Sequence, residues 1–133
     1  MRRLSAVPLL AIPLILANVL AFAGDEGLDH VWFLIPLPSG VAAAISTGVA
    51  LIGLCLVFLY AEIFKATRTG QASILDHVLS MFVFVVALVE LITVPRLGNG
   101  VFLVIVLTTL IDVIAGFTVT ISSARRDFGT SAG

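Results

Sequence analysis

The sequence has few charged residues, and this scarcity limits the class of protein that it can encode. Of its 133 residues, seven are Lys or Arg and eight are Asp or Glu, together 11% of the chain. Soluble domains are about one quarter charged, so this composition cannot build a water-exposed surface. The hydrophobic content of 60% and the mean hydropathy of +1.22 agree. We therefore expect a membrane protein, with 1–133 forming a single transmembrane domain.

Cysteine is almost absent, since Cys55 is the only one and lies in the middle of an apolar run. A lone cysteine forms no internal disulfide and has no partner for a metal site, so we interpret it as a packing residue. The sequence also shows no Gly-rich phosphate loop, no nucleic-acid-binding motif and no catalytic Ser/His/Asp or Cys/His spacing. We expect no enzymatic activity, no cofactor, no metal and no nucleic-acid partner.

Four apolar runs are long enough to cross a bilayer, at 4–23, 41–61, 74–94 and 101–121. A crossing takes about 20 apolar residues, and lipid offers no partner to an open strand edge, so each run is predicted to be helical. The short connection at 97–100 predicts that the last two helices pack as an antiparallel pair. The expected fold class is an all-α membrane protein, a four-transmembrane-helix antiparallel bundle.

Positive charge is concentrated on one side of this topology. Six of the seven basic residues precede the first run, lie between the second and third, or follow the fourth: Arg2, Arg3, Lys65, Arg68, Arg125 and Arg126. Only Arg96 lies on the opposite side. Short loops rich in Lys and Arg stay cytoplasmic, which predicts cytoplasmic N- and C-termini. We expect the membrane to be a bacterial inner (plasma) membrane.

The first run also resembles a secretory signal peptide. Two arginines precede it, and Ala21-Phe22-Ala23 at its end fits an A-x-A cleavage site. Cleavage would leave three helices with the amino end outside. Pro8 and Pro13 are tolerated in a membrane helix that packs on neighbours, so we favour retention, with cleavage as the alternative.

The connection at 24–39 is the longest one. Its first part is acidic and its second part, 31–38, is apolar with two prolines. This stretch is too short to cross a bilayer and cannot form a long helix, so we expect a short apolar interfacial segment or a cap on the bundle. Ser39 is then the predicted N-cap of the second helix. We interpret His30 and its acidic neighbours as a solvated loop and not as a metal site.

Ionisable residues inside a crossing helix are costly and are functional candidates by default. Asp112 lies near the centre of the fourth run, with Thr108 one turn before it and Gly116 one turn after it on the same face. It fits either a proton or cation site or a structural hydrogen bond between helices. We favour the structural interpretation.

Glu90 lies about one turn from the outer end of the third run. One interpretation pairs it with Arg96 at the membrane interface. The alternative is a small polar pocket shared with residues of similar depth in the first two runs: Asn18, Ser46 and Thr47. A relay from this pocket to Asp112 would need water or the hydroxyls of Thr108 and Thr109.

Two other acids are expected to have local roles at the cytoplasmic end. Glu62 lies three residues before Lys65 and is interpreted as half of an interfacial ion pair. The segment 73–76 resembles a capping box, so Asp76 is predicted to cap the third helix.

Small residues recur every four positions in the second run, at Gly40, Ala44 and Gly48. Such ridges let membrane helices approach closely. The sequence therefore favours a non-catalytic subunit or assembly partner of a larger membrane complex, in contact with the lipid bilayer and with other membrane subunits or further copies of itself. The alternative is a small oligomeric transporter or proton/cation pathway, with Asp112 as the coupling residue and Glu90 as the outer gate.

Overall fold

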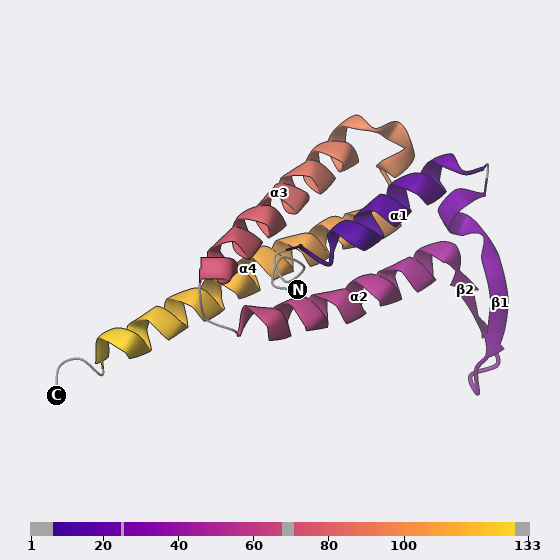
Figure 1. The fold of residues 1–133 in the computed structure, drawn as a ribbon. Helices are drawn as coiled ribbons and strands as arrows, with labels where there is room; N and C mark the ends of the chain where they lie inside the picture. Colours follow the sequence, from indigo (N-terminus) through magenta and orange to yellow (C-terminus); the bar gives the residue numbers. More distant parts are fainter. Residues whose placement is uncertain (1–6, 25, 68–70, 130–133) are drawn as a thin grey trace.

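The computed structural model describes residues 7–24, 26–67 and 71–129. Its helices are α1 (Ala11–Phe22), α2 (Thr47–Ala66), α3 (Gln71–Thr93) and α4 (Gly100–Gly129), with short 3-10 helices η2 (Gly27–Asp29) and η3 (Pro95–Leu97). Two strands, β1 (Val31–Pro36) and β2 (Ala42–Ser46), lie between η2 and α2. Figure 1 shows these helices gathered in one bundle, with the strands at one end.

Three of the described helices are long and apolar enough to cross a membrane, namely α2, the part of α3 at Ile74–Thr93 and the part of α4 at Gly100–Ser122. Their outward side chains are large and hydrophobic, as at Val57, which is 64% exposed. A helix that is hydrophobic all round is buried in a large protein or in a membrane, and this bundle is too small to bury three. These helices therefore indicate a membrane protein.

Helix α1 is shorter than the helix predicted over 4–23, of which residues 4–6 lie outside the described part. It has 12 residues, or about 18 Å at 1.5 Å per residue. The two prolines explain its start. A helix beginning at Ala11 keeps Pro8 outside and places Pro13 in the first turn, where the missing N–H leaves no hydrogen bond unfilled.

A β-hairpin replaces both the predicted irregular segment and the predicted first turns of helix two. Strands β1 and β2 pair antiparallel, with Phe33 opposite Ile45, and Trp32 is the extra residue of a bulge. In the connecting turn the N–H of Gly40 donates to the carbonyl of Leu37 at 3.0 Å, and Gly40 has a φ of +83°. This matches the three-residue hairpin loop that ends on a glycine bulge.

The predicted ridge of small residues on helix two is wrong. Gly40 lies in the hairpin turn and Ala44 in β2, because α2 begins at Thr47 and not at residue 41. Only Gly48 of the three lies in the helix, where a Cβ would come 2.7 Å from Val101 and 3.1 Å from the carbonyl oxygen of Leu28. Gly48 is therefore a close contact within this chain.

The predicted helix caps are also wrong. Ser46 caps α2 in place of Ser39, since its Oγ accepts the N–H of Val49 at 3.3 Å. Helix α3 begins at Gln71, before the predicted capping box, so Asp76 lies inside the helix. The apolar pattern at 74–94 predicts only the part of α3 that suits lipid, whereas the hydrogen-bonded helix begins before that part.

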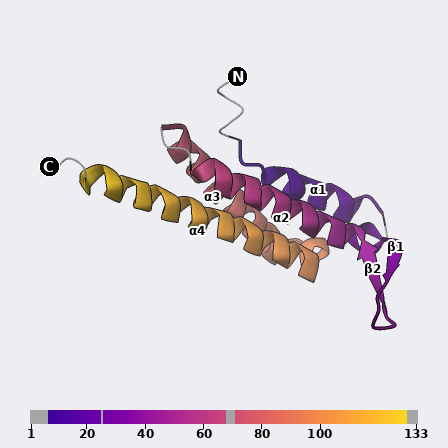
Figure 2. The ribbon, with the colours of Figure 1, turned by 90° about the horizontal axis from the view of Figure 1, so that it is seen from below.

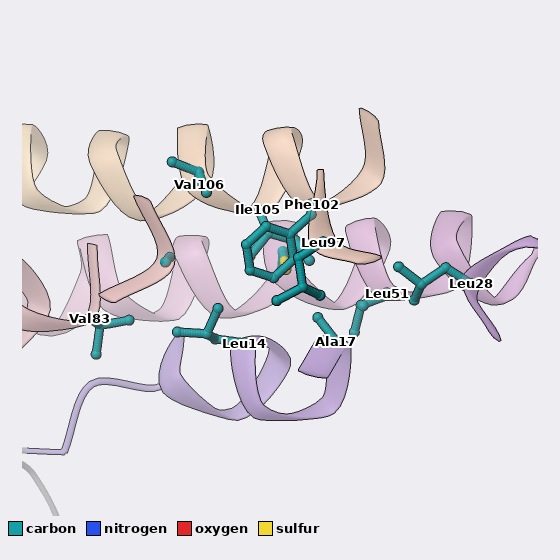
Figure 3. Close-up of a cluster of buried hydrophobic side chains, with 11 residues drawn as sticks. Leu14, Ala17, Leu28, Leu51, Val83, Leu97, Phe102, Ile105 and Val106 are labelled. Carbon is teal, nitrogen blue, oxygen red and sulfur yellow. The ribbon is translucent and has the colours of Figure 1, made fainter. Parts of the chain in front are cut away.

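The apolar core lies where α4 packs against α2 and α3 and where α1 closes one side (Figure 3). Helices α3 and α4 are joined by η3 and pack along each other. Phe102 and Ile105 of α4, Leu97 of η3 and Cys55 of α2 are fully buried in this core. The core occupies the half of the bundle nearer to the hairpin, and polar residues fill much of the other half.

Candidate functional site

Several ionisable side chains are buried between α2, α3 and α4, near the end of the bundle where α2 leads into α3. Glu62 is 2% exposed, Asp76 is 5% exposed and Asp112 is 7% exposed. Lys65 and Ser80 lie among them. We call these five residues the Lys65 cluster.

Lys65 connects several parts of the chain through its side-chain nitrogen. Its Nζ lies 2.8 Å from Oε2 of Glu62 and 2.8 Å from Oδ1 of Asp76. The same nitrogen donates to the backbone carbonyl of Val7 at 3.1 Å. One of the three N–H donors of the ammonium group is thus used by the backbone carbonyl, and both carboxylates lie at ion-pair distance from the same nitrogen. Lys65 therefore contacts α2, α3 and the segment before α1. Glu62 adds a second bond to that segment, because it accepts the backbone N–H of Leu9.

The predicted roles of Glu62 and Asp76 are corrected by this arrangement. Glu62 does pair with Lys65 as predicted, and its carboxylate is buried between helices. Asp76 is not a cap and binds the same ammonium from α3. The spacing of 62 and 65 predicts their ion pair because residues three apart share a helix face. Asp76, the third residue, belongs to another helix, and no spacing within one helix predicts its contact with Lys65.

Asp112 lies in α4, 12 residues after its start and about 18 Å along the helix axis. Its carboxylate accepts a hydrogen bond from the side chain of Ser80 on α3, and it lies close enough to Lys65 for a direct electrostatic interaction. The hydroxyl of Thr108 on the same face donates to the carbonyl of its own helix at Val104, at 2.7 Å. The contact made by Asp112 therefore links α4 to α3.

His77 packs against α4 at the level of the cluster. Its Nε2 lies 2.8 Å from Oγ1 of Thr120, and its ring centroid is 6.0 Å from that of Phe117. Gly116 lies against the same ring, since a Cβ at this position would be 2.5 Å from Nδ1 of His77. The absence of a side chain at Gly116 thus allows α4 to approach α3 here.

A second polar contact lies toward the hairpin end of the bundle. The side-chain amide of Asn18 on α1 donates to Oε2 of Glu90 on α3 at 2.9 Å, and to the carbonyl of Leu14 at 3.1 Å. The structure thus brings together two of the four residues that form the predicted polar pocket.

The other two residues of that pocket are engaged elsewhere. Ser46 caps α2, and Thr47 is buried at the first position of this helix. The Oγ1 of Thr47 accepts the indole N–H of Trp32 at 2.8 Å and donates to the carbonyl of His30 at 3.3 Å. These two residues therefore attach the hairpin to α2 and do not extend the Asn18–Glu90 contact.

The predicted pair between Arg96 and Glu90 is absent among the described contacts. Arg96 donates to the carbonyl of Ala21 at 3.4 Å, and its guanidinium lies 5.4 Å from the ring centroid of Phe22. Both partners lie near the end of α1. Arg96 therefore holds α1 to the connection between α3 and α4.

Apolar packing separates the two polar sites. The buried core residues between them on α3 and α4 are hydrophobic: Val83, Ala87, Ile105 and Val106. Thr108 and Thr109, the predicted relay residues, donate their hydroxyls to backbone carbonyls of their own helix. Among the described hydrogen bonds, neither threonine contacts Glu90 or Asp112.

A hollow of about 310 Å³ opens at the hairpin end, with Glu26, Asp29, Arg96 and Asn99 among its lining residues. Nδ1 of His30 lies 2.6 Å from Oε2 of Glu26 beside it, and both side chains are exposed. Within residues 7–24, 26–67 and 71–129 no group of three or more His, Cys, Asp or Glu is placed to hold a metal ion. The hollow is lined by opposite charges at the rim of the bundle.

In comparisons with known proteins, the chain matches no family model, no curated protein sequence and no solved structure. Its function is therefore argued from the contacts described above.

Replacing Asn18 with leucine is expected to lower the free energy of unfolding by about 1 kcal/mol, because Glu90 loses its amide donor inside the bundle. Reversible unfolding in mixed detergent micelles, followed by circular dichroism, measures the change. Val19→Leu on the exposed face of α1 is the control and leaves stability unchanged. A loss of the same size when Asn18→Leu is made in a Glu90→Ala background would show that the two side chains are not coupled.

Proposed function

We propose that this chain is a small integral membrane protein that acts as a non-catalytic subunit or assembly partner of a larger membrane complex. The outward face of α2 is the observation that carries this proposal. Ala50, Gly53 and Val57 share that face and are exposed, and a Cβ at Gly53 would meet nothing within 4 Å. A lipid-facing helix with small residues lets a helix of another subunit approach closely.

The buried charges support a structural role. Each described acid inside the bundle has a partner in this chain: Glu62 and Asp76 with Lys65, Asp112 with Ser80, and Glu90 with Asn18. Contacts of this kind stabilise one arrangement of helices. Together with the apolar layer between Glu90 and Asp112, they favour the subunit over the transporter or proton/cation pathway as the function of this chain.

We also propose that the chain crosses the membrane four times, with both termini cytoplasmic, in a bacterial inner (plasma) membrane. Helix α1 is too short to cross by itself, but its segment reaches both ends of the bundle. The carbonyl of Val7 binds Lys65 near the end of α2, and the carbonyl of Ala21 binds Arg96 after the opposite end of α3. The uneven distribution of Lys and Arg supports the orientation.

Retention of the first segment is part of this proposal. Leu10, Leu14 and Ala17 are 1%, 6% and 0% exposed, and the last two belong to the apolar core. Cleavage after Ala23 would remove these side chains from the bundle and expose the apolar surface that they cover.

The proposal is tested by purifying the tagged full chain from its native membranes in a mild detergent and measuring the mass of the particle. We expect a discrete complex heavier than the 14.0 kDa chain in its micelle. Gly53→Leu is expected to reduce recovery of that complex about tenfold, because the added side chain blocks close approach of a helix. Val85→Leu, on an exposed position of α3, is the matched control and leaves recovery unchanged. Recovery of the unmodified protein as a bare monomer would refute the proposal.

A further inference from the structure

The β-hairpin, residues 31–46, is a second surface that the proposed function does not use. We propose that it lies in the headgroup region of the bilayer and inserts its apolar side chains toward the acyl chains, as a lipid-binding arm beside the crossing helices. Its residues include no charged side chain.

Both faces of the hairpin are apolar; β1 is exposed along its length, and β2 is in part exposed and in part half-buried. The side chains of β1 from Val31 to Ile35 are between 41% and 62% exposed. Successive side chains of a strand point to opposite faces, so neither face is the polar one that water would favour. A two-stranded hairpin is marginally stable by itself in water, and a surface of this kind needs an apolar environment.

The position of the hairpin matches the boundary of the membrane. Strand β2 ends at Ser46, and α2, whose apolar sequence is long enough to cross a membrane, begins at Thr47. The hairpin therefore starts at the level where the hydrocarbon core ends. In Figures 1 and 2 it projects sideways from the end of the bundle and extends past α2 and α4. A segment that runs across the direction of the helices lies along the plane of the membrane that they cross.

The headgroup region of the bilayer also suits the hairpin better than the hydrocarbon core or a charged protein surface does. The outer edges of both strands have unpaired N–H and C=O groups, which the headgroup region can hydrate and the hydrocarbon core cannot. An uncharged hairpin gives a charged surface no ion pair.

Two hydrogen bonds attach the hairpin to the start of α2. The backbone N–H of Thr47 donates to the carbonyl of His30 at 2.9 Å, and the indole N–H of Trp32 donates to Oγ1 of Thr47 at 2.8 Å. The ring of Trp32 is thus tied by its polar edge to the start of α2 while the side chain stays 62% exposed. Tryptophan prefers this position at the interface between membrane and water.

Trp32 is the only tryptophan in the chain, so its fluorescence reports the hairpin alone. The full-length protein is reconstituted into phosphatidylcholine vesicles that contain lipids brominated either near the headgroup or near the ends of the acyl chains. We expect headgroup-proximal bromine to reduce Trp32 emission by roughly half or more, and chain-end bromine to reduce it less, as an interfacial ring requires.

Two variants make the experiment decisive. Trp32→Phe combined with Phe82→Trp moves the probe to a side chain of α3 that is 64% exposed and lies outside the proposed docking face of α2, and brominated lipid must quench it if the reconstitution is sound. Leu34→Asp adds a charge to the hairpin, and we expect it to weaken quenching of Trp32 by headgroup-proximal bromine.

Three results decide the matter. Quenching that is strongest with headgroup-proximal bromine supports the lipid-binding arm. Emission that dissolved acrylamide quenches and brominated lipid does not would place the hairpin in water and overturn the proposal. Emission insensitive to both quenchers would show that a protein surface covers the hairpin, a second copy or another subunit, and would overturn it equally.

Discussion

Replacing Lys65 with methionine is expected to lower the free energy of unfolding by about 3–5 kcal/mol. Glu62 and Asp76 are 2% and 5% exposed, and the substitution leaves both carboxylates buried without their shared cation. Methionine keeps most of the length of the side chain, so the loss reports the charge and its hydrogen bonds more than packing. The measurement is reversible unfolding in mixed detergent micelles.

The control for this prediction removes the acids together with the cation. In the triple variant Lys65→Met, Glu62→Gln, Asp76→Asn neither of the two carboxylates paired with Lys65 is left charged, and we expect most of the lost stability to return. Replacing a whole buried ion pair is far less damaging than removing one partner. If the single variant unfolds like the natural sequence, Lys65 does not hold these helices together.

The second large effect is expected at Gly116. Alanine there places a Cβ 2.5 Å from Nδ1 of His77, and this buried ring is held by Thr120 and packs on Phe117. The ring cannot turn aside without losing those contacts, so we expect Gly116→Ala to destabilise the protein by about 1–3 kcal/mol.

Gly53→Ala is the matched control for Gly116→Ala. A Cβ at Gly53 meets nothing within 4 Å, so this variant should show only the usual gain of about 0.5–1 kcal/mol for replacing glycine inside a helix. The two variants are compared in the same unfolding assay. Equal effects at the two positions would contradict the close contact between α4 and His77.

The long apolar runs predicted most of the helical fold. The structure confirms helices over the third and fourth runs, as α3 and α4, since an apolar run of this length has one stable conformation in lipid. Prediction failed at 41–46, an alanine-rich stretch that favours a helix by itself. It forms β2 because the apolar strand at 31–36 lies across a turn containing Pro38 and Gly40. A turn of this kind is typical of a β-hairpin, but the apolar residues after it also fit the start of a membrane helix.

The candidate site was harder to predict than the fold. Glu62 and Lys65 are neighbours on one helix, so their spacing indicates a pair. Asp76 is separated from Lys65 by a connection between helices. Its position suggests a cap when the helix is predicted to start near residue 74, but in α3 the same position faces α2. Asn18 and Glu90 were grouped by their depth alone, which is reliable only when two helices pack side by side.

The contact between Val7 and Lys65 also bears on the order in which the protein is assembled. The chain is synthesised from its N-terminus, so the segment containing α1 is made before Lys65 and Asp76. Its backbone can bind the ammonium only after α2 is complete, and the ammonium gains its second carboxylate only when α3 has begun to form. The first segment made therefore gains this contact only after most of the bundle has been synthesised.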